Sequence, residues 1–514
     1  MLGQTPRPAD WTPAPRQSTA YEFAPLPEAA AHVPPALARV PGGTFLMGNS
    51  FNNLYPAEGY AKEVPVHAVP VTAFFVGRFE ITNEEMARTL QWAYGNGLVE
   101  VAHTVTTNGV TNFYGTVHNT EGTQRELLNL DGAYCQIAFT NGAFWVAAGK
   151  SNFPCIYVTW HGALAFCNYL SDREGLPRAV DFAPPDWSVD ISAAGYRLPT
   201  EAEWEKACRG GIPGTHFPWP DDSVQGTNNY AYSIDPAKAN YADLRYGSPA
   251  NHPMHPWFSE AVRTTPVGYY DGSQVITNLS TNIPFRGADF GQTNDMANGY
   301  GLYDMAGNVY EWCLDYLGTN WYANPAALLP DPTGPAAETS YMTQRVARGG
   351  GFAPFFFSQP AEPSFQRCAF RNASYSVGWT DVMLGFRVVR RLTAYETWAV
   401  AQGLDPLAAN GQADGDRDED GQSNYGEYVA DTQPTNPASF FRVAGVGPVA
   451  ATVAAVYWGV SGRVYTVEGV ANPAQTNAWE FLAAVTNATT GDSQIAVPAT
   501  EARQFLRIKA KLAP

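Results

Sequence analysis

Residues 298–312 limit the fold of this chain more than any other segment does. They read Asn-Gly-Tyr-Gly-Leu-Tyr-Asp-Met-Ala-Gly-Asn-Val-Tyr-Glu-Trp, a density of glycine and aromatic residues that suits neither a plain strand nor a helix. Glycine allows sharp turns that direct backbone carbonyls inward. Asp304 and Glu311 add anionic oxygens beside those carbonyls, and calcium prefers oxygen ligands of both kinds. The segment predicts either a calcium-binding turn or an acidic turn in a loop-rich fold.

The composition is that of a globular, loop-rich protein with an acidic surface. The chain has 514 residues, enough for roughly two to four domains, and hydrophobic residues make up 45% of it. The 47 glycines and 40 prolines favour turns over long helices. Because the net charge is −17 and no basic patch stands out, we expect neither nucleic acid nor an anionic membrane surface as a partner.

The sequence predicts an exported protein without a membrane span. No apolar run approaches the roughly 20 residues that a span requires. The first residues lack the apolar core of a signal peptide, so we expect that a leader was removed and that Met1 replaces it. Few lysines and many Asn, Thr, Tyr and Trp residues favour secretion or the cell surface, and the six cysteines are compatible with it.

Changes in composition and pattern divide the chain into four segments. An extended, proline-rich tail precedes a long region of short alternating strands, glycine turns and few helices. A short helix and an acidic linker come next. The last segment alternates Val, Tyr and Phe with small polar residues, which is typical of a small all-β, sandwich-like module. The segments are residues 1–33, 34–391, 392–440 and 441–514.

Local signals predict four helices. Thr82 and Thr200 stand at N-cap positions, and Thr200 forms a capping box with Glu203. Apolar residues recur at helical spacing over residues 158–170, and an amphipathic pattern covers residues 393–402. Two further segments are interpreted as surface elaborations, residues 95–150 and 262–297.

The clearest metal-binding motif lies in the acidic linker. Asp-Arg-Asp-Glu-Asp-Gly-Gln-Ser-Asn-Tyr-Gly-Glu, residues 416–427, fits the twelve-residue calcium loop D-x-D-x-D-G-x5-E without a mismatch. Gly421 allows the sharp turn, and Asn424 is placed to hold a bridging water. The alternative is a solvated acidic linker. The predicted ligands are the carboxylates of Asp416, Asp418 and Asp420, the carbonyl of Gln422 and both carboxylate oxygens of Glu427.

This loop differs from the paired EF-hands of calcium sensors. The predicted helix at 393–402 ends 14 residues before it. The loop resembles the single-loop calcium modules of dockerins and thrombospondin type 3 repeats, which in secreted bacterial proteins stiffen the joints between domains. Millimolar extracellular calcium fills such a loop even at an affinity on the order of 10⁻⁴ M.

Four ordered motifs mark the 34–391 segment. They are Pro-Gly-Gly-Thr-Phe-Leu-Met-Gly at 41–48, Gly-Tyr-Arg-Leu-Pro-Thr-Glu-Ala-Glu-Trp-Glu at 195–205, the 298–312 run, and Arg-Gly-Gly-Gly at 348–351 with Arg-Cys-Ala-Phe-Arg at 367–371 and Leu-Gly-Phe-Arg at 384–387. Together they resemble the formylglycine-generating enzyme, or sulfatase-modifying factor, family. The resemblance implies an irregular α+β fold related to C-type lectins, with little regular secondary structure.

The same resemblance implies a domain without its family's chemistry. Active members oxidise a sulfatase cysteine to formylglycine with O2 and a copper ion held by two cysteine thiolates, soft ligands that suit Cu(I). Those cysteines lie between the motifs found here at 348–351 and 367–371. No cysteine lies between Cys313 and Cys368, and the catalytic positions fall on Pro354 or Ser358 and on Pro363. We therefore expect a pseudoenzyme that binds no copper.

Three further departures from the family pattern lie around the same pocket. The family's serine after Arg-Gly-Gly is Gly351, the asparagine before Leu-Gly-Phe-Arg is Met383, and a tryptophan is replaced by Tyr310. Iron-dependent relatives rely on a His-x3-His-x-Glu motif, and none of the eight histidines here has that spacing. An oxidoreductase with a non-cysteine metal site nevertheless remains an alternative.

The resemblance also implies two calcium sites in this segment. In the second, the family's aspartate position falls on Ser259, beside Glu260. The ligands are Asp304, the carbonyls of Met305, Gly307 and Val309, and Glu311 in the first site, and Asn240 and Tyr241 in the second.

Cysteine positions imply one disulfide by the same resemblance, between Cys208 and Cys368. Cys167 matches another family cysteine whose partner position is Val388, so we expect a buried thiol. Two interpretations remain open for Cys135 and Cys155, a bond between them or two buried thiols. Cys313 is expected in the core.

These observations lead to three functional hypotheses. The first is a secreted, calcium-stabilised binding or structural protein on a catalytically inactive scaffold, the second an oxidoreductase with another metal, and the third a subunit of a surface assembly that self-associates. Under the first, aromatic residues either form a platform for a glycan, peptide or protein subunit or fill the space of the lost active site. These residues are Tyr310, Phe355, Phe356, Phe357, Tyr375 and Trp379.

Overall fold

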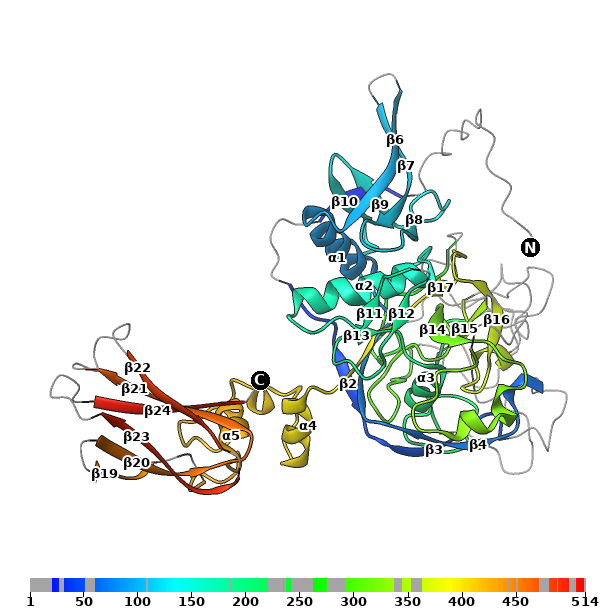
Figure 1. Cartoon of the computed structure of the whole chain (residues 1–514). Coiled ribbons are helices and arrows are strands. Elements are labelled where there is room, and N and C mark those ends of the chain that lie inside the picture. Colours follow the sequence, from blue (N-terminus) through cyan, green and yellow to red (C-terminus); the bar gives the residue numbers. More distant parts are fainter. Residues whose placement is uncertain are drawn as a thin grey trace. The chain divides into compact units, whose positions relative to one another are not determined.

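The computed structural model describes most of the chain and divides it into two compact units, Met1–Arg391 and Leu392–Pro514. Short strands and a few helices joined by irregular segments give an α+β fold (Figure 1). None of the helices in the described part combines the length and hydrophobicity that a membrane span requires. The described residues are 21–26, 32–50, 61–107, 110–184, 186–220, 234, 237–241, 262–274, 292–336, 344–352, 363–439, 441, 443–449, 452–470, 480–487, 489–498 and 505–512.

The helices of the first unit begin where side-chain caps satisfy their free amides. Thr82 and Thr200 each form a capping box, with Glu85 and Glu203 respectively, and Thr159 accepts a hydrogen bond from the Gly162 amide. The predicted N-caps at Thr82 and Thr200 are therefore confirmed. The helices are α1 (Asn83–Gly95), α2 (Trp160–Arg173) and α3 (Glu201–Cys208).

Helix α2 is buried around most of its circumference, and its buried residues include the polar side chains of Asn168 and Ser171. Gly162 explains how closely it packs, because a Cβ there would lie 1.8 Å from the carbonyl oxygen of Leu127. Leu127 belongs to β8 (Glu126–Asn129), so only glycine permits this approach of helix to strand.

Small sheets with non-sequential strand order surround these helices. Two four-stranded sheets run in the orders β13-β18-β5-β2 and β16-β15-β14-β17; β14 and β17 pair in parallel. The strands are β13 (Tyr196–Arg197), β18 (Val389–Arg391), β5 (Phe74–Gly77), β2 (Leu37–Val40), β16 (Asn372–Ser376), β15 (Gln344–Arg348), β14 (Tyr310–Tyr316) and β17 (Leu384–Gly385).

The remaining sheets of this unit are antiparallel and have two or three strands. Their members are β1 (Phe23–Pro25), β10 (Ala143–Ala147) and β9 (Ile137–Thr140); β6 (Val99–Thr107), β7 (Val110–Asn119) and β8; β3 (Gly43–Met47) and β4 (His67–Val71); and β11 (Val180–Asp181) and β12 (Ser188–Val189).

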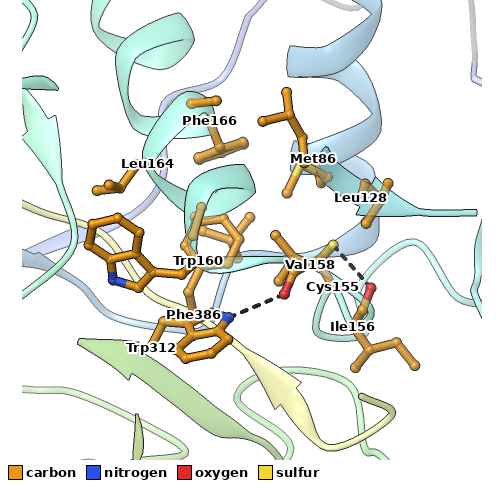
Figure 2. Packing of buried hydrophobic residues seen from close by; sticks show 14 of the residues in the cluster. Met86, Leu128, Cys155, Ile156, Val158, Trp160, Leu164, Phe166, Trp312 and Phe386 are labelled. Carbon is orange, nitrogen blue, oxygen red and sulfur yellow. Dashed lines mark hydrogen bonds between the residues drawn. The ribbon is translucent and has the colours of Figure 1, made fainter. Parts of the chain in front are cut away.

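The main hydrophobic core joins α1 and α2 to the sheet that carries β14. Figure 2 shows part of it, with Met86 from α1, Phe166 from α2 and Trp312 from β14. The indole nitrogen of Trp312 donates to the carbonyl of Val158 at 3.1 Å, which satisfies the one polar atom of that ring (Figure 2).

Two expectations about this unit are wrong. Residues 23–25, assigned to an extended tail, form β1 and pair with β10. Residues 95–150, interpreted as a surface elaboration, place Val117, Leu128 and Ile137 in the main core. Short strands that bury one face against a helix distant in the sequence give a weak periodic signal, so the hydrophobic pattern did not predict them.

The second unit combines two short helices with two three-stranded antiparallel sheets, whose strands are orange to red in Figure 1. Tyr457, Ile495 and Val497 from one sheet share a core with Tyr465 and Val467 from the other. The elements are α4 (Ala394–Ala401) and α5 (Asn424–Ala430), then β19 (Val443–Val449), β20 (Thr452–Gly459) and β23 (Gly491–Pro498) in one sheet and β22 (Glu480–Thr486), β21 (Arg463–Val470) and β24 (Phe505–Leu512) in the other.

Candidate functional site

Hydrogen bonds from backbone amides to aspartate side chains hold the acidic loop before α5 in a tight turn. One carboxylate oxygen of Asp416 accepts from the Glu419 amide at 2.8 Å and the other from the Gly421 amide at 2.9 Å. The backbone turns at Gly421 with φ of +93°, a conformation that glycine adopts without strain. Asp420 accepts from the amide of Gln422 at 2.8 Å. These bonds turn the acidic side chains towards one region.

Three of the predicted ligands meet in that region. Carboxylate oxygens of Asp416, Asp418 and Asp420 lie within 4.8 Å of one another. Glu427, the last predicted ligand, lies on α5 and is fully buried. Helix α5 begins inside the motif, at its ninth position, which the sequence analysis did not predict.

Several oxygens of this cluster are buried and have no hydrogen-bond partner among the residues that the structure describes. They are both carboxylate oxygens of Asp418, one of Asp420 and one of Glu427. Burial, followed by the charges of Asp418 and Asp420, raises the pKa of Glu427 to about 7. Burying acceptors without donors raises the free energy of the folded state. A bound cation would remove both this cost and the repulsion between the carboxylates.

The donor set indicates which cation the loop suits. All the predicted ligand atoms are oxygens, and no nitrogen or sulfur is among them. Such ligands select hard cations, and a flexible loop with a bidentate glutamate suits calcium better than the smaller, strictly octahedral Mg²⁺. Gln422 is partly buried next to Gly421, where its carbonyl was predicted to bind.

In the first unit, the predicted ligands at 304–311 lie on a sequence of left-handed turns. Asp304, Gly307 and Asn308 have φ values of +57°, +90° and +62°. The carbonyl oxygens of Met305 and Val309 lie 3.9 and 3.6 Å from the point that a Cβ on Gly349 would occupy. Two of the three predicted carbonyl ligands therefore lie close to Gly349.

Glu311 has protein partners of its own. Both of its carboxylate oxygens accept from Arg387 at 2.6 Å, and the Trp204 indole nitrogen donates to it at 2.7 Å. The sequence analysis did not identify this pairing. The 304–311 site remains a prediction, and one of its predicted ligands, Glu311, already forms a buried ion pair with Arg387.

Glu80 is a buried acid near this turn that the sequence analysis missed. It accepts hydrogen bonds from the side chain of Asn308 and from the amide of Val309. Burial, then the charges of Asp304 and Glu311, raise its pKa well above the usual range, and burial raises the pKa of Asp304 to about 6. Glu80 is a single charge between apolar residues of Phe-Glu-Ile, the only sequence signal for it.

The second predicted calcium site lies partly outside the described residues, because Ser259 and Glu260 are not among them. The carbonyl of Asn240 accepts from the Asn308 amide at 2.8 Å, and its side-chain amide donates to the Arg263 carbonyl at 2.7 Å. Tyr241 is buried and donates its hydroxyl to the Ile234 carbonyl. Asn240 thus contacts the 304–311 turn, and the metal-binding role of Asn240 and Tyr241 remains a prediction.

The aromatic residues proposed as a platform separate into two kinds. Tyr310 and Tyr375 are each only 1% exposed and pack edge to face at 6.1 Å, so these two are core residues, as the second of the two alternatives predicts, and they do not form a platform. Trp379 is 50% exposed. Phe355, Phe356 and Phe357 lie outside the described residues.

The pocket positions that differ from the family pattern are filled. The ring of Tyr310 lies 3.4 Å, and the Cβ of Met383 3.4 Å, from the point that a Cβ on Gly351 would occupy. Bulk at Tyr310 and Met383 thus occupies the volume next to Gly351. This packing leaves no thiolate among these three residues.

The two cysteines assigned to a disulfide lie side by side. The sulfur atoms of Cys208 and Cys368 are 3.1 Å apart, and both residues are fully buried as free thiols. Burial, together with Cys368, raises the pKa of Cys208 well above its usual value, so a metal-binding thiolate is disfavoured there. Their bond remains a prediction that needs only a small closing movement. Cys135, Cys155, Cys167 and Cys313 are also buried free thiols.

A cavity of about 320 Å³ opens elsewhere, between α1, α2 and residues 32–36. Its wall includes Arg88 and Arg173 as well as the apolar side chains of Phe166 and Val267. None of the predicted platform residues lines it. The sequence analysis missed this cavity because its wall comes from five separate stretches of chain.

Comparison with known proteins decides the family. Residues 22–392 match the sulfatase-modifying factor enzyme 1-like domain. The chain belongs to this family. It is 27% identical over 326 residues to the formylglycine-generating enzyme of Thermomonospora curvata, covering 62% of this chain and 82% of that protein. It is 28% identical over 344 residues to the formylglycine-generating enzyme of Streptomyces coelicolor, covering 64% and 85%.

Other proteins similar to this chain bear different names. The serine/threonine-protein kinase pkn1 of Chlamydia caviae is 27% identical over 351 residues, which cover 68% of this chain and 37% of the kinase. Among solved structures, Treponema denticola variable protein 1 is 23% identical with a TM-score of 0.37, over 69% of this chain and 95% of that one. Membership in the sulfatase-modifying factor family therefore gives the scaffold of the first unit, and function has to be argued from the residues of the site.

Proposed function

We propose that this protein is a secreted, calcium-binding protein whose sulfatase-modifying-factor domain serves binding or assembly and does not form formylglycine. One observation carries the calcium part. Four buried oxygens of Asp418, Asp420 and Glu427 have no donor, and they belong to the residues that a twelve-residue calcium loop uses as ligands. A cation that prefers oxygen ligands would give each of these oxygens the partner that it lacks.

The absence of catalysis is supported by the donor set of the pocket. The interval between the 348–351 and 367–371 motifs has no cysteine, so the soft pair that would hold Cu(I) is absent from the sequence. Tyr310 and Met383 fill the space beside Gly351 with apolar atoms. A binding or structural role needs neither of those lost groups.

Secretion follows from the kind of calcium site. A single loop with a dissociation constant on the order of 10⁻⁴ M stays nearly empty at cytosolic calcium and fills at the millimolar concentration outside cells. The buried Cys208 and Cys368 pair, with its sulfurs in contact, suits an oxidising compartment. The binding partner proposed for the first unit is a glycan, peptide or protein subunit.

Calorimetric titration of chelator-treated protein with CaCl2 tests the calcium part. We expect saturable binding that Asp418→Asn weakens at least tenfold, while Glu419→Gln, which removes a charge from an exposed non-ligand position of the same loop, leaves it unchanged. Equal weakening by both variants would show that only the total charge matters.

Metal analysis and a peptide assay test the catalytic part. Protein purified without chelator should contain calcium and no stoichiometric copper or iron. Incubation with a Cys-x-Pro-x-Arg peptide, copper, thiol and oxygen should give no product of formylglycine mass. Turnover, or a stoichiometric redox metal in the first unit, would refute the proposal.

A further inference from the structure

Helix α5 is too short to be stable without help. It has seven residues, and isolated helices below about 12 residues are marginal in water. Ser423 caps its first turn by accepting from the Gly426 amide, and the Asn424 side chain donates to the carbonyls of Asn410 and Gln412, each at 2.9 Å. These contacts hold the N-terminal end of α5 whether or not an ion is bound.

The C-terminal half of α5 is held differently. Glu427, the last ligand of the calcium loop, has one carboxylate oxygen without a partner, and the other accepts only from the Thr432 hydroxyl, at 3.3 Å. Asp431 closes the helix in a left-handed conformation, with φ of +59°. Without an ion, repulsion from Asp418 and Asp420 acts on this half of the helix.

Arg463 attaches the same half of α5 to β21. Arg463 donates from Nε to the Val429 carbonyl at 2.8 Å and from Nη2 to the Tyr428 carbonyl at 3.3 Å. Its guanidinium also lies 5.8 Å from the centre of the Tyr428 ring. Carbonyls at a helix C-terminus carry partial negative charge, so a cation there stabilises the helix.

Arg463 is the first residue of β21, the central strand of its sheet. Its two acceptors follow the calcium ligand Glu427 by one and two residues. Any movement of Glu427 towards an ion therefore repositions the carbonyls that anchor β21. The loop and the strand are linked through less than one helical turn.

We propose that calcium bound at residues 416–427 fixes the C-terminal turn of α5 and thereby strengthens the attachment of β21 through Arg463. This inference rests on the proposed calcium binding. It adds that the ion is a conformational device, because the strands of the second unit are held firmly to the loop only when calcium is present.

Hydrogen–deuterium exchange of the full chain, in 1 mM CaCl2 and in EGTA, tests the link. In the wild-type protein calcium should slow exchange at least fivefold both in residues 423–431 and in residues 460–466. Arg463→Ala should keep the calcium protection of 423–431 and lose that of 460–466. Arg507→Ala is the matched control, because it removes another arginine that binds β21, here from β24 through an ion pair with Glu468.

The outcomes separate the two proposals. If the titration shows no calcium binding, the proposed function fails. If calcium binds and protects 423–431 but never 460–466 in the wild type, or if Arg463→Ala retains the protection of 460–466, the coupling is refuted. Should Arg463→Ala lose the fold, judged by circular dichroism, Arg463→Lys replaces it. Lysine keeps the charge but cannot reach both carbonyls with a rigid fork, so it should retain less than half of the protection.

Discussion

Asp418→Asn should stabilise the second unit in the absence of calcium, and calcium should remove most or all of that advantage. Both oxygens of Asp418 lack a hydrogen-bond donor, so without an ion the carboxylate contributes only repulsion. With an ion it becomes a ligand. A residue whose role is purely structural would destabilise the protein on substitution in both conditions.

The magnitudes follow from the geometry of the loop. The carboxylates of Asp416, Asp418 and Asp420 lie within 4.8 Å of one another, a separation at which two unit charges repel by about 1 kcal/mol in water and about 3 kcal/mol at a protein surface. In EGTA, Asp418→Asn should therefore stabilise the unit by about 1 kcal/mol or more. A unit of the size of residues 392–514 melts about 4 °C higher for each kcal/mol.

Calcium stabilises the wild type more than the variant and so removes the advantage of the variant. At 1 mM calcium and a dissociation constant on the order of 10⁻⁴ M, binding stabilises the folded state by about 1.4 kcal/mol, or about 6 °C. A tenfold weaker site in Asp418→Asn would gain only about 0.4 kcal/mol. The calcium-induced shift in melting temperature should therefore shrink from about 6 °C to about 2 °C.

Differential scanning calorimetry of the full chain measures both effects. Glu419→Gln is the control, because Glu419 lies in the same loop, is exposed and occupies no ligand position. It should shift the transition little in EGTA and preserve the full calcium shift. A lower melting temperature for Asp418→Asn in EGTA would contradict the reasoning, as would an undiminished calcium shift.

Three further predictions concern the first unit. Burial raises the pKa of Asp315 to about 8, so the folded state retains a proton that the unfolded chain releases above about pH 4. The free energy of unfolding should therefore fall as the pH rises from about 4 to 8. Urea midpoints at pH 5, 7 and 9 should show a shallower fall in Asp315→Asn, and an unchanged slope would contradict this prediction. Arg348 bonds to Glu201 and Glu205, so Arg348→Met should lower the free energy of unfolding, measured by urea denaturation, by about 3–5 kcal/mol. Full wild-type stability in Arg348→Lys would show that the guanidinium bridge between the two glutamates is not needed. Protein matured in an oxidising medium should yield a Cys208–Cys368 linked peptide on non-reducing mass mapping, and alkylation of both cysteines after denaturation would exclude the bond.

Features encoded within a few consecutive residues could be predicted from the sequence. The capping boxes at Thr82 and Thr200 lie where the side-chain pattern placed them. Apolar spacing over residues 158–170 predicted most of α2, and residues 393–402 contain α4. The acids of the 416–420 stretch converge as the loop motif requires. In each of these, the decisive contacts join residues fewer than about a dozen positions apart.

Features built from distant residues could not be predicted. Glu311 and Arg387 pair across 76 positions, and Glu80 reaches Asn308 across 228. Tyr310 and Tyr375 pack in the core because strands β14 and β16 flank β15, which no local pattern reveals. Pairing of β1 with β10 likewise depends on more than a hundred intervening residues. Hydrophobic pattern alone does not choose among such long-range partners.

The motifs that placed this chain in its family are largely motifs of the buried scaffold. Arg348 donates to Glu201 and Glu205, Arg371 pairs with Glu201, and Arg387 pairs with Glu311. Removing one member of a buried ion pair costs about 3–5 kcal/mol, so stability alone is enough to preserve these residues whether or not the domain is catalytic. Thiolates that bind copper take no part in these buried ion pairs, so the same stability argument does not apply to them. Family membership here therefore predicts the fold, whereas activity depends on positions such as Gly351 and Met383, where this chain departs from the pattern.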